Sequence, residues 1–329
     1  MPRTVSSLLL RACLLFAGGL CAFTATALET VRVGFQQSGT VQWELQLMQE
    51  LGLAEREGVR LELVPLATKD ATHIALQGGA VDVVVDDWLW VSRARDEGRP
   101  YTCVTHSLAA GALYARPDSG ITRLADLAGK KLGVAGGAVD KSWLLLRAYA
   151  QKTLGVDLAQ QVEPQYGAPP LLNQLALRGE LPAVLNYWNY GARLSAAGFR
   201  EVISMRTVLT GLGAPPGLPV IAWVFPDEFA AQHGETLRGF LRASRAAKQA
   251  LATDDAVWER LRPLMQAAND TEFRSLRDTY RQGIPQHVGP QDALTASRIF
   301  ALLARLGGEA LVGRGTTLAT GTFWTGYAD

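Results

Sequence analysis

A glycine-rich turn followed by charged and hydroxyl side chains is the segment of this sequence best suited to bind an anion. Gly136 and Gly137 follow an apolar stretch and precede Lys141, Ser142 and Trp143. Glycines leave backbone N–H groups accessible, and the start of a helix carries partial positive charge, so the lysine and the hydroxyl would act at the same point. A tight turn before a self-capped helix explains the same residues without a ligand.

Seven aromatic residues lie in segments that are expected to form the cleft, at or near the ends of predicted strands. They are Trp88, Trp90, Trp143, Tyr187, Trp188, Tyr190 and Trp223. Indole rings in a cleft stack on flat conjugated ligands or enclose cations, whereas core packing is the more frequent role of any single tryptophan. We expect the group to line a binding cleft, because the four bulky or polar side chains in succession from Tyr187 to Tyr190 cannot all enter one core.

Polar residues at other predicted strand ends complete the candidate ligand-binding set. They are Gln36, Ser38, Lys69 and Asn186. The adjacent carboxylates of Asp86 and Asp87 would either cap a helix or orient a cationic group of a ligand. If Asp87 lines the cleft, a purely anionic ligand becomes harder to accommodate.

Neither metal-dependent nor nucleophilic catalysis is indicated. His73, His106, His233 and His287 show no H-E-x-x-H pattern or other close metal spacing. No G-x-S-x-G elbow is present. We therefore expect no catalytic residues, no metal site and no enzyme activity.

The first 27 residues are typical of a cleaved signal peptide. Arg3 and Arg11 precede the apolar run 12–23, which ends at the small residues 25–27. The 32 basic and 31 acidic residues include two arginines in this leader, which leaves 30 basic and 31 acidic residues beyond it. A balanced charge argues against nucleic acid as a partner, and Cys103 is the one cysteine left. The expected product is a periplasmic protein.

Strand and helix patterns alternate along the mature sequence. Predicted strands cover 31–35, 60–65, 81–85, 112–116, 131–134, 184–187, 202–205 and 220–225, and the predicted helices include 41–57, 71–77 and 141–154. This alternation is typical of doubly wound α/β sheets. The dense break at Pro215–Pro219 and the turn at 117–120 divide the chain into two lobes, 28–115 plus 219–329 and 116–218.

The chain resembles bacterial solute-binding proteins of ABC importers, in the family of nitrate, taurine, alkanesulfonate and thiamine-precursor binders. The resemblance rests on the segments Leu76–Val84, Leu124–Val134 and Phe225–Phe229. The resemblance implies a type II periplasmic binding protein of two doubly wound lobes with a central ligand cleft. It also implies crossovers near Tyr114–Ser119 and near Pro215–Pro219, a monomer, and an ABC permease as partner. One departure, Pro182-Ala183 where relatives often carry an Asp-Ala pair, prevents a ligand assignment by analogy.

The anion-binding turn and the aromatic residues together predict a flat, multiply negative ligand. The resemblance extends to binders encoded for quinone cofactor uptake, and pyrroloquinoline quinone fits best, with reversible addition of Lys141 to a quinone carbonyl as a possible bond. Taurine, another sulfonate or a thiamine precursor is the alternative. Two other classes stay open: a pyrimidine-synthase-like enzyme, because one eukaryotic branch of the fold family uses lysine and histidine chemistry, and a periplasmic sensor or delivery protein.

Overall fold

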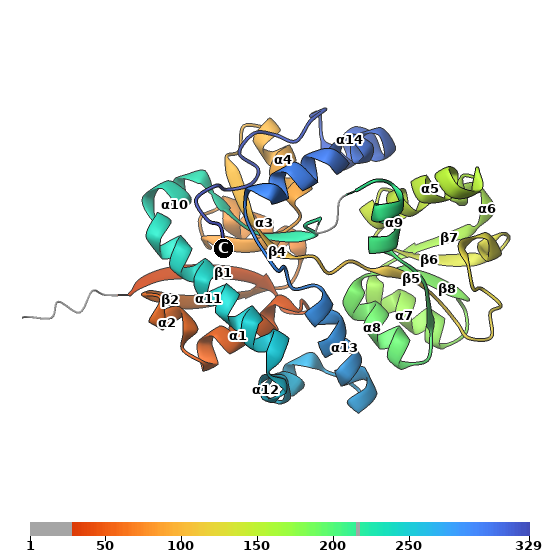
Figure 1. Cartoon of the computed structure of the whole chain (residues 1–329), viewed down its shortest axis with the longest axis horizontal. Helices are drawn as coiled ribbons and strands as arrows, with labels where there is room; N and C mark the ends of the chain where they lie inside the picture. The colour runs from red at the N-terminus through yellow and green to blue at the C-terminus, as the bar shows by residue number, and fades with distance from the viewer. Residues whose placement is uncertain (1–27, 215–217) are drawn as a thin grey trace, which may run out of the picture.

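Two α/β lobes lie side by side in the computed structural model, which describes residues 28–214 and 218–329 (Figure 1). Each lobe contains one five-stranded sheet flanked by helices. The expected signal peptide at 1–27 and residues 215–217 of the Pro215–Pro219 break lie outside the described residues. Within the described residues, no helix is long and apolar enough to cross a bilayer.

The sheet of the first lobe has the strand order β2-β1-β3-β10-β4. Its strands are β1 (Glu29–Gln36), β2 (Val59–Leu66), β3 (Val83–Asp86), β4 (Tyr101–Ser107) and β10 (Ile221–Pro226). The first three are mutually parallel, and β10 inserts antiparallel between β3 and β4. Val31 and Val33 alternate into the core, where they are fully buried.

Helices from both ends of the chain cover this first sheet. They are α1 (Val41–Glu50), α2 (Leu53–Arg56), α3 (Lys69–Gln77), α4 (Trp88–Asp96), α10 (Asp227–Gln232), α11 (Gly234–Thr253), α12 (Asp255–Met265), α13 (Asp270–Gln282) and α14 (Pro290–Val312). The single helix predicted over 41–57 is wrong, because Gly52 adopts a left-handed conformation with φ 58° and separates α1 from α2.

The sheet of the second lobe has the strand order β7-β6-β8-β5-β9. Its elements are β5 (Ala112–Ala115), a 3₁₀ turn (Leu124–Leu127), β6 (Lys131–Ala135), α5 (Lys141–Leu154), α6 (Leu158–Gln161), β7 (Glu163–Gly167), α7 (Pro169–Leu177), β8 (Ala183–Asn186), α8 (Trp188–Ala196), β9 (Arg200–Ser204) and α9 (Met205–Gly211). The predicted doubly wound α/β architecture is therefore confirmed in both lobes.

The chain passes between the lobes earlier than the crossover expected near Tyr114–Ser119. The sequence grouped 112–115 with the first lobe, but β5 pairs with β8 and β9 and so lies in the second sheet. The crossing segment precedes Ala112 and includes Gly111, where a Cβ atom would lie 2.0 Å from the carbonyl oxygen of Asn186. Only glycine permits this approach of two backbones.

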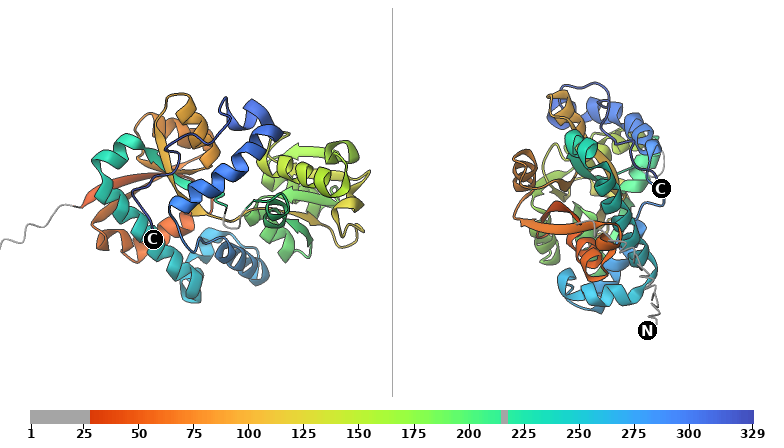
Figure 2. Two further views of the ribbon diagram at one scale, coloured as in Figure 1. Left: turned by 45° about the horizontal axis from the view of Figure 1, so that its top comes forward. Right: turned by 90° about the vertical axis from the view of Figure 1, so that its left-hand side faces the viewer.

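Two helices near the C-terminus lie between the lobes, one on each side (Figure 2). α13 packs along α8, and α14 packs along both α5 and α4. The lobes are therefore joined by packed helices as well as by the two crossing segments.

Candidate ligand-binding site between the lobes

The starts of α4 and α5 meet where the two lobes face each other. The Lys141 ammonium, at the first residue of α5, lies 2.6 Å from Asp87 Oδ2, just before α4. The other carboxylate oxygen of Asp87 caps α4 by accepting the Leu89 N–H at 2.8 Å. Both side chains keep about a fifth to a quarter of their surface exposed, at 21% and 24%. The pair links the two lobes and remains accessible to solvent.

The glycine-rich turn before α5 is occupied by a carboxylate of the chain itself. Asp140 Oδ1 accepts the backbone N–H groups of Ser142 at 2.9 Å and Trp143 at 3.4 Å, and its Oδ2 accepts the Tyr187 hydroxyl at 3.2 Å. Gly136 has φ 86°, and a Cβ atom there would lie 2.9 Å from Asp140 Oδ2. The alternative of a self-capped helix is confirmed, so the N–H groups of Ser142 and Trp143 are not free to bind an anion.

A second ionic cluster lies next to the lobe-bridging pair. The side chain of Asp86 is only 1% exposed; its Oδ1 lies 2.7 Å from the Lys69 ammonium, and its Oδ2 accepts a hydrogen bond from His73 Nε2. Lys69 and His73 are four residues apart on α3 and therefore share one face. Burial acts to raise the pKa of Asp86, but the His73 hydrogen bond and the Lys69 charge outweigh it and lower that pKa.

Three of the tryptophans predicted to stack on a ligand are core residues. The exposed fraction is 0% for Trp88 and Trp143 and 1% for Trp223. Trp88 donates its indole N–H to the Pro219 carbonyl at 2.9 Å, and Trp223 donates to Ser244 Oγ at 3.1 Å. The prediction of ligand stacking is wrong for these three rings, because large aromatic side chains contribute most to stability when they fill an apolar core.

The remaining aromatic residues divide between packing and exposure. Trp188, from the second lobe, packs edge-on against Trp43 of the first lobe at 6.1 Å between ring centroids. Trp90 is buried and stacks on His73 at 4.3 Å. Tyr187 is 39% exposed, and Tyr190 is partly exposed. As expected, the run from Tyr187 to Tyr190 does not enter one core, and Tyr187 is its most exposed aromatic ring.

The other predicted residues differ in what they offer to a ligand. Gln36 is partly exposed at the end of β1, and Ser38 is exposed in the loop that follows. Asn186 is buried, donates to the Pro169 carbonyl and to Asn173 Oδ1, and therefore supports the loop before α8 instead of presenting its amide. The sequence reasoning overlooked His73 and Asp140, although the spacing of His73 from Lys69 and the position of Asp140 before a helix were both visible signals.

A buried polar cluster of similar composition lies in the core of the first lobe. The fully buried Glu44 carboxylate, on α1, forms an ion pair with Lys248 and accepts hydrogen bonds from Ser244 Oγ at 2.5 Å and the Tyr280 hydroxyl at 3.1 Å. Lys248 also donates to His106 Nδ1 at 2.9 Å. Burial and then the charge of Lys248 lower the pKa of His106 well below its ordinary value of 6.5, which favours the neutral imidazole.

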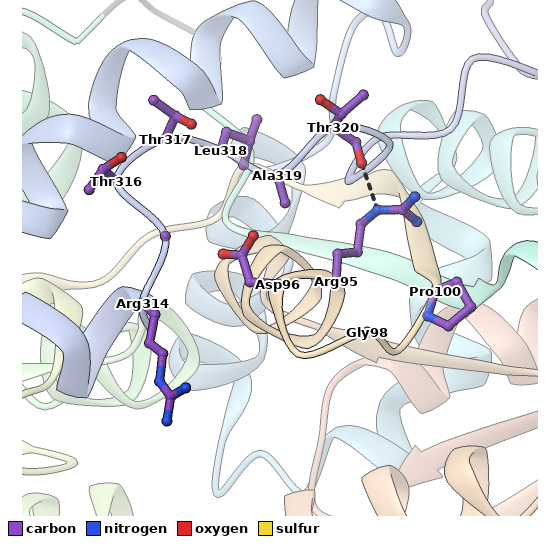
Figure 3. A pocket seen from close by; sticks show the side chains of 11 residues that line it. Arg95, Asp96, Gly98, Pro100, Arg314, Thr316, Thr317, Leu318, Ala319 and Thr320 are labelled. Carbon is purple, nitrogen blue, oxygen red and sulfur yellow. Dashed lines mark hydrogen bonds between the residues drawn. The ribbon is translucent and has the colours of Figure 1, made fainter.

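An open hollow of about 650 Å³ lies on the first lobe, between the end of α4 and the C-terminal segment 314–320 (Figure 3). Arg95 forms part of its wall and donates to the Thr320 carbonyl at 2.7 Å. The same guanidinium also bonds both carboxylate oxygens of Asp227. This hollow is lined by none of the predicted site residues, and the partly exposed Arg95 in its wall is already paired with Asp227.

The two-lobed fold is that of periplasmic binding proteins. The periplasmic aliphatic sulphonate binding protein SsuA from Escherichia coli superposes with a TM-score of 0.71 and 18% identity, over 90% of this chain and 92% of that one. The alkanesulfonate-binding protein SsuA from Xanthomonas axonopodis pv. citri, bound to MOPS, gives 0.67 and 16%, over 90% and 98%. The periplasmic nitrate-binding protein NrtA from Synechocystis PCC 6803 gives 0.55 and 12%, over 76% and 69%.

The sequence itself identifies the family. The sequence model of the NMT1/THI5 like family matches residues 45–256, which is more than half of the 329-residue chain. The chain therefore belongs to the NMT1/THI5 like family. No curated protein sequence matches it significantly.

Proposed function

We propose that this chain is the exported, periplasmic solute-binding component of an ABC importer and captures a small sulfonate that also carries an amine, as taurine does. The observation that carries the proposal is the Asp87–Lys141 pair, in which one anion and one cation from opposite lobes lie 2.6 Å apart and remain accessible. A zwitterionic ligand inserted between them would give the ammonium of Lys141 a sulfonate and the carboxylate of Asp87 an amine.

The charges around this pair favour a ligand that contains a cation. Asp86 is compensated by Lys69 and His73, whereas Asp140 pairs with no lysine or arginine in the parts of the chain that the structure describes. Asp87 and Asp140 both lie near Lys141, and Asp87 also lies within the electrostatic reach of Lys69. A purely anionic ligand would be repelled by the second carboxylate, while an added amine would be attracted to it.

The similar structures support the sulfonate half of the proposal. Two of them are described as sulphonate- or alkanesulfonate-binding proteins, and one of these is bound to MOPS, a sulfonate whose morpholine ring contains a basic nitrogen. Their identity with this chain is below 20%, so they support a fold able to bind sulfonates. The local charges described above support the amine.

Pyrroloquinoline quinone is the second candidate. Lys69 and Lys141 provide two cations, and Tyr187 provides a partly exposed ring beside Asp140, as a flat tricarboxylate would require. The burial of Trp88, Trp143 and Trp223 removes the stacking surface on which this ligand was first predicted. Addition of Lys141 to a quinone carbonyl would also require the ion pair with Asp87 to break first.

Calorimetric titration of the purified mature protein with four compounds distinguishes these candidates. Taurine should bind with saturable heat, ethanesulfonate should bind more weakly because it lacks the amine, and β-alanine tests whether a carboxylate replaces the sulfonate. Pyrroloquinoline quinone is titrated in parallel. Saturable binding of the quinone alone would establish the second candidate, and no saturable heat with either sulfonate would overturn the first.

Two lysine variants provide the matched comparison for that titration. Lys141→Ala should weaken taurine binding by about 1 to 3 kcal/mol, the range typical of a charge-assisted hydrogen bond. Lys130→Ala removes an exposed lysine in the loop before β6 and should leave binding unchanged. Equal losses in both variants would show that net charge, and not the position of Lys141, determines affinity.

Transport requires a separate measurement, because a sensor or delivery protein would bind the same ligand. Uptake of the radiolabelled ligand by cells that lack this chain should fall and should recover when the chain is restored. Unchanged uptake would favour the sensor or delivery role. Chemical turnover of the bound ligand, detected by mass spectrometry, would instead favour an enzyme.

A further inference from the structure

A second contact between the lobes is formed by α8 and α13. Along this seam, which we define as the packed faces of α8 and α13, Trp188 lies against Trp43 and Tyr280, with ring centroids 6.1 and 5.9 Å apart. Ser275 Oγ donates a hydrogen bond to the Ala192 carbonyl at 2.7 Å. Figures 1 and 2 show α13 reaching from the first lobe to the second.

Arg193 provides the strongest polar contacts of the seam. Its guanidinium, from the last turn of α8, donates to the Met265 carbonyl at 2.8 Å and to the Gln266 carbonyl at 3.1 Å and forms an ion pair with Glu272. Met265 is the last residue of α12, where the free carbonyl groups of a helix carry partial negative charge. A residue of the second lobe therefore caps a helix of the first.

The α12–α13 hairpin is anchored in the first lobe. Tyr280 donates its hydroxyl to the buried Glu44, and Arg281 bonds the Asp255 carboxylate and the Leu251 carbonyl. Trp258 is fully buried in the same core. The hairpin is therefore part of the first lobe, and any separation of the lobes along the seam must break the contacts of Arg193.

The two ends of α13 are unequal in their distance from the crossing segment. Just beyond its C-terminal end, the Gly283 carbonyl accepts the Leu108 N–H at 2.8 Å, and a Cβ atom on Gly283 would lie 2.4 Å from Ala109 Cβ. Glu272 lies 11 residues earlier, which corresponds to about 16 Å along a helix. The crossing segment thus marks a pivot end of the seam, and Arg193 binds at the free end, where a rotation of the lobes produces the largest displacement.

We propose that Arg193 is the latch that holds the two lobes together, a positioning residue that sets the equilibrium between the joined and separated arrangements. All of its acceptors belong to the chain itself, so it favours the joined arrangement whether or not a solute is bound. A guanidinium suits this role because its fork reaches two carbonyl groups and a carboxylate at once. By contrast, Lys141 at the other lobe contact pairs with a single carboxylate.

Distances measured between spin labels on the two lobes test the latch without any ligand. Glu50→Cys on α1 and Leu177→Cys on α7 place labels at exposed positions of the first and second lobes, while Cys103 is fully buried and stays unlabelled. In this background Arg193→Ala should add a population with a longer interlobe distance, and Arg193→Lys should add a smaller one, since an ammonium cannot span all three acceptors.

The control removes a guanidinium from the same helix hairpin without touching the seam. Arg277, on α13, pairs with Asp255 and Asp278 of the first lobe, so Arg277→Ala should leave the distance distribution as in the parent protein. An unchanged distribution in Arg193→Ala, or an equal change in Arg277→Ala, would overturn the latch.

Two further variants keep the test decisive if Arg193→Ala fails to fold. Glu272→Gln removes the ionic partner of Arg193, and Ser275→Ala removes the neighbouring hydrogen bond. Each should lengthen the distance in the same direction as Arg193→Ala but to a smaller extent, and two unchanged distributions would contradict the proposal. Because no ligand enters this experiment, its failure is distinguishable from failure of sulfonate binding.

Discussion

The first lobe contains two clusters made from the same three kinds of side chain: a carboxylate, a lysine and a histidine. In one, Glu44, Lys248 and His106 are all buried and are joined by Ser244 and Tyr280. In the other, Asp86 is buried, but its partner Lys69 is 53% exposed and lies next to the lobe contact. Composition is shared, whereas access to water differs.

The pKa values of the two lysines shift in opposite directions, because the balance between burial and neighbouring carboxylates differs. Burial lowers the pKa of Lys248, because the charged form loses its hydration. Lys69 is also desolvated, but the charges of Asp86 and Asp87 outweigh that loss and raise its pKa. The cluster of Glu44, Lys248 and His106 is therefore suited to fixing α1, α11 and α13 in place. The cluster of Asp86, Lys69 and His73 is suited to presenting a stable cation at the proposed binding site.

The largest loss of folding stability should appear when the buried cluster of Glu44, Lys248 and His106 loses its carboxylate. Glu44→Gln leaves the buried ammonium of Lys248 without an anion and should lower the free energy of unfolding by about 3 to 5 kcal/mol. Urea denaturation followed by circular dichroism measures the loss. The double variant Glu44→Leu with Lys248→Met should recover most of it, because no buried charge then remains. A loss below 1 kcal/mol in Glu44→Gln would contradict this account.

A smaller loss of folding stability is expected when the cluster of Asp86, Lys69 and His73 loses its carboxylate. Asp86→Asn removes the anion that Lys69 and His73 share, but the lysine can regain its hydration from solvent. The free energy of unfolding should fall by about 1 to 3 kcal/mol, mainly from the lost buried hydrogen bonds. Measured under the same urea conditions, a loss equal to that of Glu44→Gln would remove the distinction between the clusters.

The two clusters should also respond to acid in different pH windows. The folded pKa of His106 lies well below 6.5, so as the pH falls below about 6.5 the unfolded chain binds a proton that the folded chain does not. Stability should therefore decline by at most about 1.4 kcal/mol per pH unit from this group. Asp86 has a folded pKa below 3.8, so its contribution is retained above that pH and is lost only as the pH falls further.

Comparison with one variant isolates the contribution of His106 to the loss of stability in acid. Denaturation midpoints of the parent protein and of His106→Asn are measured between pH 7.5 and pH 5. The parent should lose stability faster than the variant as the pH falls. Parallel curves would show that His106 does not contribute to the acid response.

The smallest effect on stability should come from Lys69→Met. Lys69 is half exposed, and the buried Asp86 keeps its hydrogen bond from His73, so the free energy of unfolding should fall by less than in Asp86→Asn, by roughly 1 kcal/mol. Taurine affinity measured by calorimetry should nevertheless fall, because a cation beside the lobe contact is lost. A large loss of stability with unchanged affinity would assign Lys69 to the fold instead of the site.

The sequence predicted those elements whose boundaries are fixed by local chemistry. The helix at 141–154 was placed correctly because Asp140 caps its start and Gly155, with φ 73°, ends it. By contrast, β4 and β7 were missed. β4 mixes buried threonine, cysteine and histidine with apolar residues, and β7 is a largely exposed strand at the edge of the sheet, so neither shows a simple hydrophobic alternation.

The candidate site was harder to predict because position along the chain does not specify which way a side chain faces. Asp87 and Trp88 are neighbours just after β3, yet Trp88 enters the core while Asp87 meets Lys141. Tyr187 and Trp188 divide in the same way. The positions of the loops were therefore predictable. Whether a loop side chain packs in the core or faces the space between the lobes depended on tertiary contacts.

The insertion of β10 between β3 and β4 also imposes an order on assembly. All strands of the second sheet lie within residues 112–204, so they are available before β10 is synthesised. The first sheet, in contrast, has an empty place between β3 and β4 until residues 221–226 return from the other lobe. A nascent chain can thus complete the second lobe first, whereas in the first lobe one edge of β3 and one edge of β4 stay unpaired until β10 arrives.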